Sequence, residues 1–344
     1  MKKRITINDI ARELGITAAT VSRALSDHPE ISLSTKNRVK AVAEQMDYVP
    51  NKVASSLRSG KTKLIGVLIP TAEHSFFGSV IHGISNIASK KGYDVLIYQS
   101  NETEEFEKKG IQTFINARVD GILASIAKDT ADFSHFTAVR DKNIPIAFFD
   151  RIKDELDISS VSIDDYQGAY QATTALIEGG YKRIAHISGP QHIKTFADRI
   201  QGYQDALRYH QVNADTELLY PGNISIAAGR AGTKHLLSLN NPPDAIFAVE
   251  DFTALGVLKE LKQQRIQVPE QFGVFGFCND IFGEHISPSL STVDQQTVNM
   301  GEEAFKLIYE LITSTATENQ IQKRVLQPAL IIRESSQKTA IKHQ

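Results

Sequence analysis

Two short helical segments joined by a glycine, within the first 25 residues, constrain this chain more than any other feature. The first segment begins after Thr6 or Asn8, either of which can cap a helix, and Gly15 supplies the turn. The second begins after Thr17, another capping residue, and runs to Leu25. Two such helices with a tight turn are typical of a helix-turn-helix, whose second helix enters the DNA major groove.

The second segment has two faces of different character. Val21, Ala24 and Leu25 lie on one side at helical spacing. The other side carries small side chains and one guanidinium, from Ala18, Ala19, Ser22 and Arg23. Such a smooth face suits a major groove, where a guanidinium can bond guanine through two hydrogen bonds. Arg23 is therefore the candidate for direct base readout, with a phosphate contact as the alternative.

A third helical segment and the charge balance argue against an ordinary helical hairpin, which is the alternative for the first two segments alone. Residues 32–47 carry apolar side chains at helical spacing and can close a three-helix core. Residues 1–63 hold twelve Lys and Arg against six Asp and Glu, whereas the remainder holds 26 against 34. A basic N-terminal piece fits nucleic-acid contact. Candidate phosphate contacts, which could equally well be helix caps, are Thr6, Ser22, Ser32 and Thr35.

From residue 64 onward, short apolar runs alternate with amphipathic helical patterns, which predicts an α/β protein with parallel sheets covered by helices on both faces. Buried strands are predicted at 64–69, 94–98, 121–124, 144–149, 184–188, 245–249 and 273–277. Helices are predicted at 77–91, 104–117, 133–142, 197–209, 227–239 and 253–264. The two rounds of alternation predict two lobes. No glycine-rich phosphate loop follows the first strand, so a dinucleotide or ATP site has little support.

Composition narrows the class of protein further. Cys278 is the only cysteine, which excludes an intrachain disulfide and a thiolate metal cluster. The N-terminus lacks the apolar run of a secretory signal, and no apolar stretch approaches the roughly 20 residues needed to span a membrane. We therefore expect a cytoplasmic protein that needs no metal or other cofactor. His74, His186 and His192 are scattered, and we expect them to be loop or core histidines.

These motifs together resemble the lactose-repressor (LacI/GalR) family of bacterial transcription regulators. The resemblance is carried by residues 6–11, 20–23, 48–51 and 53–54 with Leu57, and it continues to about Glu334. It implies a helix-turn-helix domain at 1–50, a hinge helix at 51–61, a periplasmic-binding-protein-like core at 62–334 and a polar tail at 335–344. The first lobe of the core would cover about 62–162 plus 290–320, and the second about 163–289 plus 321–334.

The resemblance makes the hinge a second DNA reader, through Asn51, Ala54 and Leu57. In the family, the hinge becomes helical when two protomers meet on DNA, and a leucine from each one wedges into the minor groove. An eight-residue helix with two serines is marginal in isolation, so we expect the hinge to be disordered off DNA. A plain flexible linker is the alternative. Because two-fold operator sites need a dimer, we expect a homodimer on palindromic double-stranded DNA.

The resemblance also places a small-molecule effector, such as a sugar or a related metabolite, between the two lobes. The positions carried over from the family are Phe77, Asp150, Arg199, Glu250, Asp251, Asn279 and Asp280. Carboxylates, an arginine and an aromatic ring suit the hydroxyls and the apolar face of a sugar. The alternative is structural: Asp150 and Asp251 could cap helices, and Arg199 could form an ion pair. Cys278 and Ile224 depart from the family pattern of an aspartate and an aromatic ring, which leaves the ligand open.

A ligand-responsive transcription regulator, most simply a repressor, is the function that these observations favour. Ligand in the cleft would change the angle between the lobes, and with it the separation of the paired hinges and the operator affinity. A solute-binding protein of a transport system would share the two lobes, but it should have a signal peptide and lack residues 1–60. An enzyme would need a nucleophile with a base or a phosphate loop, and the sequence shows neither, so we expect no catalysis.

Overall fold

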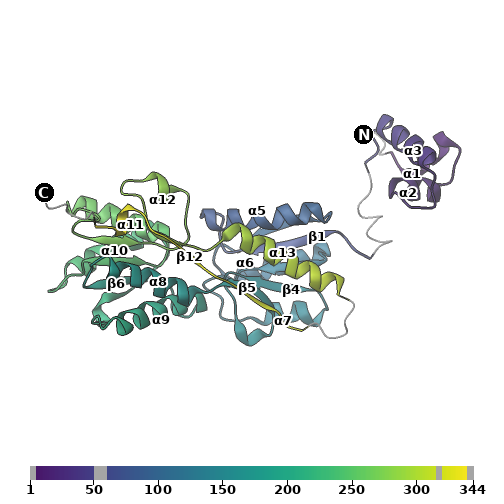
Figure 1. Cartoon of the computed structure of the whole chain (residues 1–344). Helices are drawn as coiled ribbons and strands as arrows, with labels where there is room; N and C mark the ends of the chain where they lie inside the picture. Colours follow the sequence, from purple (N-terminus) through teal and green to yellow (C-terminus); the bar gives the residue numbers. More distant parts are fainter. Residues whose placement is uncertain (1–4, 50–59, 315–319, 339–344) are drawn as a thin grey trace. The chain divides into compact units, whose positions relative to one another are not determined.

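The computed structural model describes residues 5–49, 60–314 and 320–338, which divide at residue 62 into an N-terminal unit and a larger core unit (Figure 1). The N-terminal unit contains α1 (Ile7–Leu14), α2 (Ala18–Leu25) and α3 (Leu33–Gln45). The predicted hinge readers Asn51, Ala54 and Leu57 lie outside the described residues. No helix in the described ranges is long and apolar enough to cross a membrane.

The three helices of the N-terminal unit pack around a small apolar core, as their spacing predicts. Its fully or nearly fully buried members are Ile10, Ala11, Val21, Ala24, Val39 and Ala43. Ala18 also packs partly against this core, so the prediction that it faces away from it is wrong. Ala18 lies one turn before Val21 and Ser22 on α2, at the boundary between the packed face and the exposed face.

Polar side chains define where these helices begin. The Thr17 hydroxyl accepts a hydrogen bond from the Thr20 backbone N–H at 3.1 Å and caps α2. Ser32 caps α3 in the same way, accepting from the Thr35 N–H at 3.3 Å. At the start of α1 the Asp9 carboxylate instead accepts from the backbone N–H of Thr6, at 2.9 Å. Each bond satisfies a backbone or side-chain group that a helix start leaves without an intrahelical partner.

The first lobe of the core is built on a six-stranded sheet in the order β11-β5-β4-β3-β1-β2, with every described pair parallel. Its strands are β1 (Leu64–Ile69), β2 (Asp94–Gln99), β3 (Gly121–Ala124), β4 (Ile146–Phe149), β5 (Ser159–Ile163) and β11 (Lys323–Leu326). The covering helices are α5 (Ser75–Lys90), α6 (Glu104–Ala117), α7 (Ser134–Asp141) and α13 (Thr297–Thr313).

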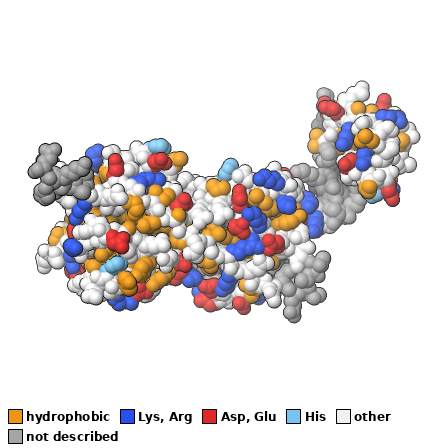
Figure 2. All heavy atoms as spheres, viewed as in Figure 1, with side chains coloured by type: hydrophobic (Ala, Val, Ile, Leu, Met, Phe, Trp, Pro, Cys, Tyr) orange, Lys and Arg blue, Asp and Glu red, His pale blue; other side chains and the backbone are white. Residues whose placement is uncertain are grey.

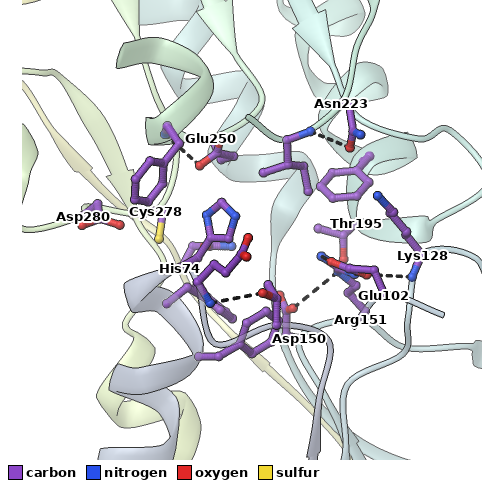
Figure 3. Close-up of a pocket in the computed structure, with 18 of the residues that line it drawn as sticks. His74, Glu102, Lys128, Asp150, Arg151, Thr195, Asn223, Glu250, Cys278 and Asp280 are labelled. Carbon is purple, nitrogen blue, oxygen red and sulfur yellow. Dashed lines mark hydrogen bonds and ion pairs between the residues drawn. The ribbon is translucent and has the colours of Figure 1, made fainter. Parts of the chain in front are cut away.

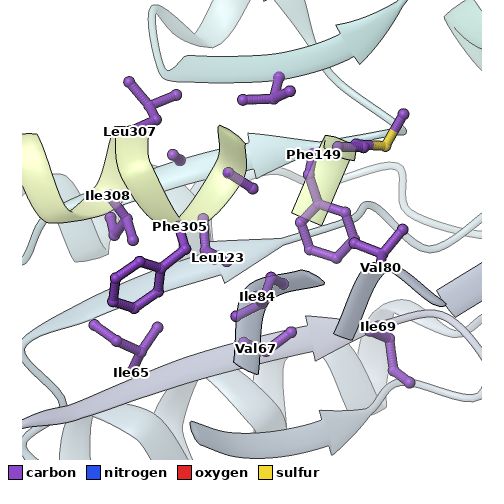
Figure 4. Packing of buried hydrophobic residues seen from close by; sticks show 14 of the residues in the cluster. Ile65, Val67, Ile69, Val80, Ile84, Leu123, Phe149, Phe305, Leu307 and Ile308 are labelled. Atoms are coloured by element: carbon purple, nitrogen blue, oxygen red, sulfur yellow. The ribbon is translucent and has the colours of Figure 1, made fainter. Parts of the chain in front are cut away.

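The residues of β1 explain why this sheet is covered on both faces. Ile65, Val67 and Ile69 point to one side and join the core under α5 and α13, where Val80, Ile84 and Phe305 also pack (Figure 4). Leu68 points to the other side and joins the core under α6 and α7. A strand that is apolar at both odd and even positions needs cover on both faces, because successive side chains alternate between faces.

The second lobe is a smaller sheet of four parallel strands in the order β7-β6-β8-β9. The strands are β6 (Ile184–Ser188), β7 (Leu219–Pro221), β8 (Ala245–Ala248) and β9 (Gly273–Phe275). Its larger helices are α8 (Asp165–Glu178), α9 (Lys194–Tyr209), α10 (Ile226–Leu237) and α11 (Asp251–Gln263), with the short α12 (Phe282–His285) following β9. The core clusters place α8 and α9 on one face of the sheet and α11 on the other.

The structure corrects the predicted lobe boundaries near the C-terminus. β10 (Thr292–Asp294) still runs beside the second lobe, since its neighbour Ser291 bridges Phe275 of β9. The first lobe is therefore entered after residue 294 rather than at 290. β11 pairs with β5, with Val325 opposite Ser162, so residues 323–326 belong to the first lobe and not to the second. The chain returns only with β12 (Ala329–Ile331), which pairs antiparallel with β10.

Several elements escaped the sequence patterns for identifiable reasons. β5 is buried along its whole length, yet three of its five residues are serines, which read as a loop. β7, β10, β11 and β12 are only three or four residues long. α13 is long and amphipathic, but it follows the two rounds of alternation and returns to the first lobe, where it packs against α5. There Gly83 of α5 faces the Val298 carbonyl so closely that a Cβ would lie 2.1 Å from the oxygen.

Candidate functional site

The exposed face of α2 is the first candidate site, and Arg23 is its most prominent side chain. The Arg23 side chain is 57% exposed, and its guanidinium lies 3.6 Å from a carboxylate oxygen of Glu30, which is itself 70% exposed. Ala19 is exposed beside it, and Ser22 is half-buried. Lys, Arg, Asp and Glu side chains are interspersed on the face of this unit seen in Figure 2. Because an exposed ion pair is weak, the Arg23 guanidinium can exchange Glu30 for another hydrogen-bond acceptor.

The candidate phosphate contacts of this unit already have intramolecular roles. Thr6 donates its hydroxyl to Asp9 at 2.7 Å, and Ser32 and Thr35 place their hydroxyl oxygens 2.9 Å apart. Thr6 and Ser32 are exposed and Thr35 is half-buried. A capping hydroxyl at a helix start lies beside backbone N–H groups that bind anions well. Capping and phosphate contact are therefore compatible for Ser32.

The second candidate site is a cavity of about 190 Å³ between the two lobes of the core. Its walls come from the segments that follow the carboxyl ends of the strands in both sheets: Thr71 and Glu73 after β1, Lys128 after β3, Asn223 after β7 and Glu250 after β8. Ligands of open α/β sheets bind at this edge, because the strands end there and their loops converge. Figure 3 shows Lys128, Asn223 and Glu250 around a common space.

Five of the seven effector residues predicted from the resemblance line this cavity. They are Phe77, Asp150, Arg199, Glu250 and Asp280. Phe77 starts in the first turn of α5 and packs edge-on against Phe149, with ring centroids 6.5 Å apart. Asp280 reaches across from the second lobe and accepts a hydrogen bond from the Ser75 hydroxyl at 2.6 Å. This bond joins the two lobes at the N-terminus of α5.

Two of the predicted effector residues, Asp251 and Asn279, are not among those that line the cavity. Asp251 is fully buried, and its carboxylate accepts hydrogen bonds from the Asp280 backbone N–H at 2.7 Å and the Thr292 hydroxyl at 2.7 Å. The Asn279 side chain accepts from Arg333 and donates to Asp294. Asp251 therefore ties the start of α11 to β10, and Asn279 ties the segment after β9 to β10; neither side chain is among those that line this cavity, and the effector role predicted for them stays a prediction.

Arg199 is held in place from three sides. Its Nε and one terminal nitrogen lie 2.9 and 2.8 Å from Asp165, and its other terminal nitrogen donates to the Val249 carbonyl at 2.6 Å. The guanidinium also lies 3.6 Å from the centre of the Phe277 ring. Burial raises the pKa of Asp165 to about 7, against the opposing effect of Arg199. The structural ion pair and the place in the cavity wall are both present, so the two predicted roles of Arg199 do not exclude each other.

The carboxylates of the cavity wall are held in low-dielectric surroundings. Asp150 follows β4 directly, adopts a left-handed backbone with φ of 61°, and accepts a hydrogen bond from Ser125 at 3.3 Å. Burial raises the pKa of Asp150, and it also raises that of Glu250, which caps α11 by accepting from Phe252 and Thr253. Burial raises the pKa of the Cys278 thiol as well, which disfavours a reactive thiolate.

Sequence reasoning missed several side chains of this wall. Glu102 and Arg151 form a paired contact in which the two terminal nitrogens of Arg151 donate at 2.7 and 3.0 Å. Burial acts to raise the pKa of Glu102, but Arg151 and the Lys128 backbone N–H lower it overall. Their places just after β2 and β4 could have revealed both residues. Gln295 lies on the crossover after β10, which no sequence pattern marked; it is 3% exposed, and its amide nitrogen has no partner among the described residues.

The three histidines have separate environments. His186 is fully buried and stacked on Phe247, with its Nδ1 2.9 Å from the Phe247 carbonyl oxygen, and burial lowers its pKa to about 4. His74 lines the cavity and lies edge-on to Phe252. His192 contacts the Lys128 carbonyl from the second lobe. No group of three metal-ligating side chains is found within the part of the chain that the structure describes.

A helix-turn-helix unit followed by a two-lobed core with a cavity between the lobes defines a DNA-binding regulator with a ligand-binding core. Comparison with known proteins agrees. Residues 6–51 match the model of the bacterial regulatory proteins of the lacI family, and residues 173–336 match a periplasmic binding protein-like domain. The HTH-type transcriptional repressor CytR of Escherichia coli (strain K12) is 32% identical over 306 residues, which is 89% of each chain. The chain belongs to the lacI family, and it is a ligand-responsive transcription regulator.

Two solved structures support the fold over nearly the whole chain. The complex of the transcriptional regulator CelR with cellobiose superposes with a TM-score of 0.73 at 27% identity, covering 96% of this chain and all of that one. The lac repressor dimer bound to operator and the anti-inducer ONPF superposes with a TM-score of 0.87, covering 97% of this chain and all of that one. Its identity of 22% shows a shared fold.

Proposed function

We propose that this protein is a homodimeric repressor that binds a palindromic operator through α2, with Arg23 reading a guanine. The exposed guanidinium on a smooth helix face supports this role, and its ion pair with the exposed Glu30 is weak enough to exchange for a base. Ala19 offers only a methyl contact, so specificity would rest on Arg23, the hinge and DNA shape. Such a regulator acts where the DNA is, in the cytoplasm, and by binding alone rather than by catalysis.

The cavity between the lobes is the proposed effector site, and this single observation carries the regulatory half of the proposal. Phe77 supplies an apolar ring face, Asp150 supplies acceptors, and the buried Gln295 amide supplies a donor without a partner among the described residues. These groups suit a small molecule rich in hydroxyls, such as a sugar or a related metabolite. The related CelR has been solved with cellobiose. Ligand binding and operator binding would change each other's affinity by the same factor.

The first experiment is selection of duplexes from a random pool on the full-length protein, followed by titration of the selected duplex and a scrambled copy. We expect a palindromic consensus, binding by two chains, and a steep fall in affinity with salt as counterions are released. Saccharides and nucleosides that shift the melting temperature are then added to the titration. A monomer without preference between the two duplexes would contradict the DNA half. Ligands that bind without altering operator affinity would contradict the regulatory half.

The hinge is tested separately with Leu57→Ala. If Leu57 wedges into the minor groove, its loss should reduce the bend of the selected duplex and weaken its binding, because the wedge unstacks a base step and permits further contacts. The bend is measured by gel mobility of circularly permuted fragments that carry the selected site. Ser59→Ala, which lacks a proposed wedge, is the control. A bend angle and an affinity that both equal those of the wild type would show that Leu57 is only part of a linker.

A further inference from the structure

The cavity between the lobes has two ends of different character (Figure 3). Glu250, Asp280 and Cys278 lie at one end, and Lys128, Asn223 and Thr195 lie at the other. The Glu250 carboxylate caps α11, and the Asp280 carboxylate accepts from Ser75, so the polar groups at this end are hydrogen-bond acceptors. This end suits a part of the ligand that donates hydrogen bonds, such as ring hydroxyls. The Lys128 end carries hydrogen-bond donors instead.

Donors without partners gather at the Lys128 end. The Lys128 ammonium has no hydrogen bond or ion pair with any described residue, although its backbone N–H donates to Glu102 at 2.9 Å. Thr195 is 4% exposed and lines the cavity, and its hydroxyl is likewise without a partner among the residues described. The Asn223 side-chain oxygen accepts from the Ile224 N–H at 2.9 Å, which leaves its amide NH₂ to donate. These three donors come from both lobes.

The start of α9 adds to this concentration of donors. α9 is a sixteen-residue helix, and its N-cap residue, Ile193, has no side-chain acceptor for the first-turn N–H groups. Thr195 is the second residue of this helix, so its unpartnered hydroxyl lies at the positive end of the helix dipole. A helix start of this kind favours a negatively charged ligand group. The buried hydroxyl is an independent sign that a ligand completes the site.

The Lys128 ammonium is not neutralised by the acidic residue that its own backbone contacts. Glu102 accepts a hydrogen bond from the Lys128 backbone N–H, but Arg151 neutralises its charge through two hydrogen bonds of 2.7 and 3.0 Å. The Arg151 and Glu102 charges cancel, and the ammonium of Lys128 has no ion pair with any described residue, whereas the carboxylates of Glu250 and Asp280 lie at the other end of the cavity (Figure 3). An uncharged ligand would leave this charge and the α9 start with only solvent to complement them. A charge-assisted hydrogen bond to an anion is roughly twice as strong as a neutral one.

We propose that the effector carries an anionic group, a phosphate or a carboxylate, which binds Lys128, Thr195 and the start of α9. Its hydroxyl-bearing remainder lies toward Glu250 and Asp280. The effector is therefore a sugar phosphate or a sugar acid rather than a neutral sugar. This inference rests on the proposed function of the cavity as the effector site.

The test compares matched pairs of ligands by calorimetry on the full-length protein. The probes are ribose with ribose 5-phosphate, and glucose with glucose 6-phosphate, gluconate and glucuronate. We expect at least one acidic member to bind about tenfold or more tightly than its neutral partner, the gain expected of a single charge-assisted hydrogen bond. Binding of phosphates alone or of carboxylates alone supports the proposal and identifies the anion.

Lys128→Met tests the assigned residue, and Lys153→Met is the matched control. Lys153 follows β4 in the same lobe, pairs with Glu155 at 3.2 Å and does not line this cavity. Lys128→Met should lose the preference for the acidic ligand and keep the wild-type melting temperature, whereas Lys153→Met should keep both. Retention of the preference in Lys128→Met would remove Lys128 from the site and overturn the proposal.

Two further outcomes would also overturn this inference: a neutral sugar that binds more tightly than its acidic partner, or failure of every acidic probe to bind. These outcomes are separable from failure of the proposed function. A neutral ligand that changes the affinity for the selected duplex would keep the effector site and exclude the anion. Ligands that bind in the cavity and leave duplex affinity unchanged would instead contradict the proposed function itself.

Discussion

Arg23 of the N-terminal unit and Arg199 of the core are both helical arginines beside a carboxylate, but their surroundings differ completely. The Arg23 side chain is 57% exposed and lies 3.6 Å from Glu30, whereas the Arg199 side chain is 4% exposed and lies 2.8 Å from Asp165. Solvent screens the first pair and leaves it nearly neutral for folding. Burial makes the second pair inseparable from the core, because either partner alone would be an uncompensated buried charge.

This contrast extends to the two candidate sites. The DNA-reading face uses exposed side chains on helices that Thr17 and Ser32 cap, so its chemistry can change without affecting the fold. The cavity uses side chains such as Glu250 that also complete a helix start. A substitution at the first site should therefore change binding alone, whereas one at a cavity residue that also completes the fold, such as Glu250 or Arg199, should change binding and stability together.

The largest expected effect is that of Arg199→Ala on the core. Removing one partner of a buried ion pair costs about 3–5 kcal/mol in the free energy of unfolding. Urea unfolding at pH 8, where Asp165 of the wild type is mostly ionised given its pKa of about 7, measures this loss. The double variant Arg199→Ala with Asp165→Asn should lose less, because no charge is left unpaired. If the double variant loses as much unfolding free energy as the single variants Arg199→Ala and Asp165→Asn together, the ion pair is not the source of the cost.

Arg23→Ala should show the opposite division between binding and stability. Loss of a guanidinium that reads a base should weaken binding of the selected duplex by ~1–3 kcal/mol while random DNA binds nearly as before. Unfolding should change by less than about 0.5 kcal/mol, since the site is exposed. Titrations on both duplexes with parallel urea curves test this. An equal loss on both duplexes would make Arg23 a phosphate contact.

Asp251→Asn sharpens the comparison through pH. Burial raises the pKa of Asp251 from 3.8 to about 7, so the folded core holds a proton that the unfolded chain has released between these values. The unfolding free energy contributed by Asp251 is therefore complete below pH 4 and is lost as pH rises toward 7, at up to about 1.4 kcal/mol per pH unit.

The measurement is a series of urea unfolding curves between pH 4.5 and 7.5. The side chain of Asp251→Asn does not titrate. The unfolding free energy of this variant should therefore fall less steeply with pH than that of the wild type, by a slope equivalent to about one proton. Asp27→Asn is the control: the Lys36 hydrogen bond lowers the pKa of this exposed carboxyl, so its change lies below pH 4. Identical slopes for the wild type and Asp251→Asn would mean that Asp251 titrates alike in the folded and unfolded chains.

Thr17→Ala has the smallest expected effect and is confined to the N-terminal unit. Loss of the 3.1 Å capping bond to the Thr20 N–H should destabilise α2 by about 0.5–2 kcal/mol. Hydrogen exchange of α2 amides should accelerate, while amides of β1 and β4 in the core exchange as before. The substitution Thr17→Ser keeps the capping oxygen and should restore most of the protection. Faster exchange in both units would contradict their energetic independence.

The fold was predictable wherever local pattern and burial agree. Each of the seven predicted strands exists, because runs such as residues 64–69 are apolar on both faces and can only be buried in a sheet covered twice. The prediction that residues 94–98 are buried is wrong, because β2 is the edge strand and is exposed or half-buried along its length. β5 could not be found, since its serines become buried only after β4 and β11 pair on either side of it. The same applies to β11, whose return to the first lobe depends on the crossover and not on local sequence.

The candidate site was predictable to the extent that it follows from strand ends. Asp150 comes directly after β4 and Glu250 comes two residues after the end of β8, so parallel strands bring them to one edge. Asp251 is next to Glu250 in the sequence but points the other way, into hydrogen bonds with β10, and no local pattern distinguishes the two. Gln295 and Thr195 join the wall only because the crossover and α9 pack against the other lobe's loops.

The amino-acid sequence by itself determined the capped three-helix unit, the alternation of strands and helices, and the family to which the chain belongs. These depend on periodicity, capping residues and glycine turns, which act over a few residues. Only the tertiary structure decided which polar side chains face the cavity and which are consumed by the fold. That choice depends on hydrogen bonds between distant segments, such as Arg151 with Glu102 and Asp280 with Ser75, whose partners are brought together only when both lobes are formed.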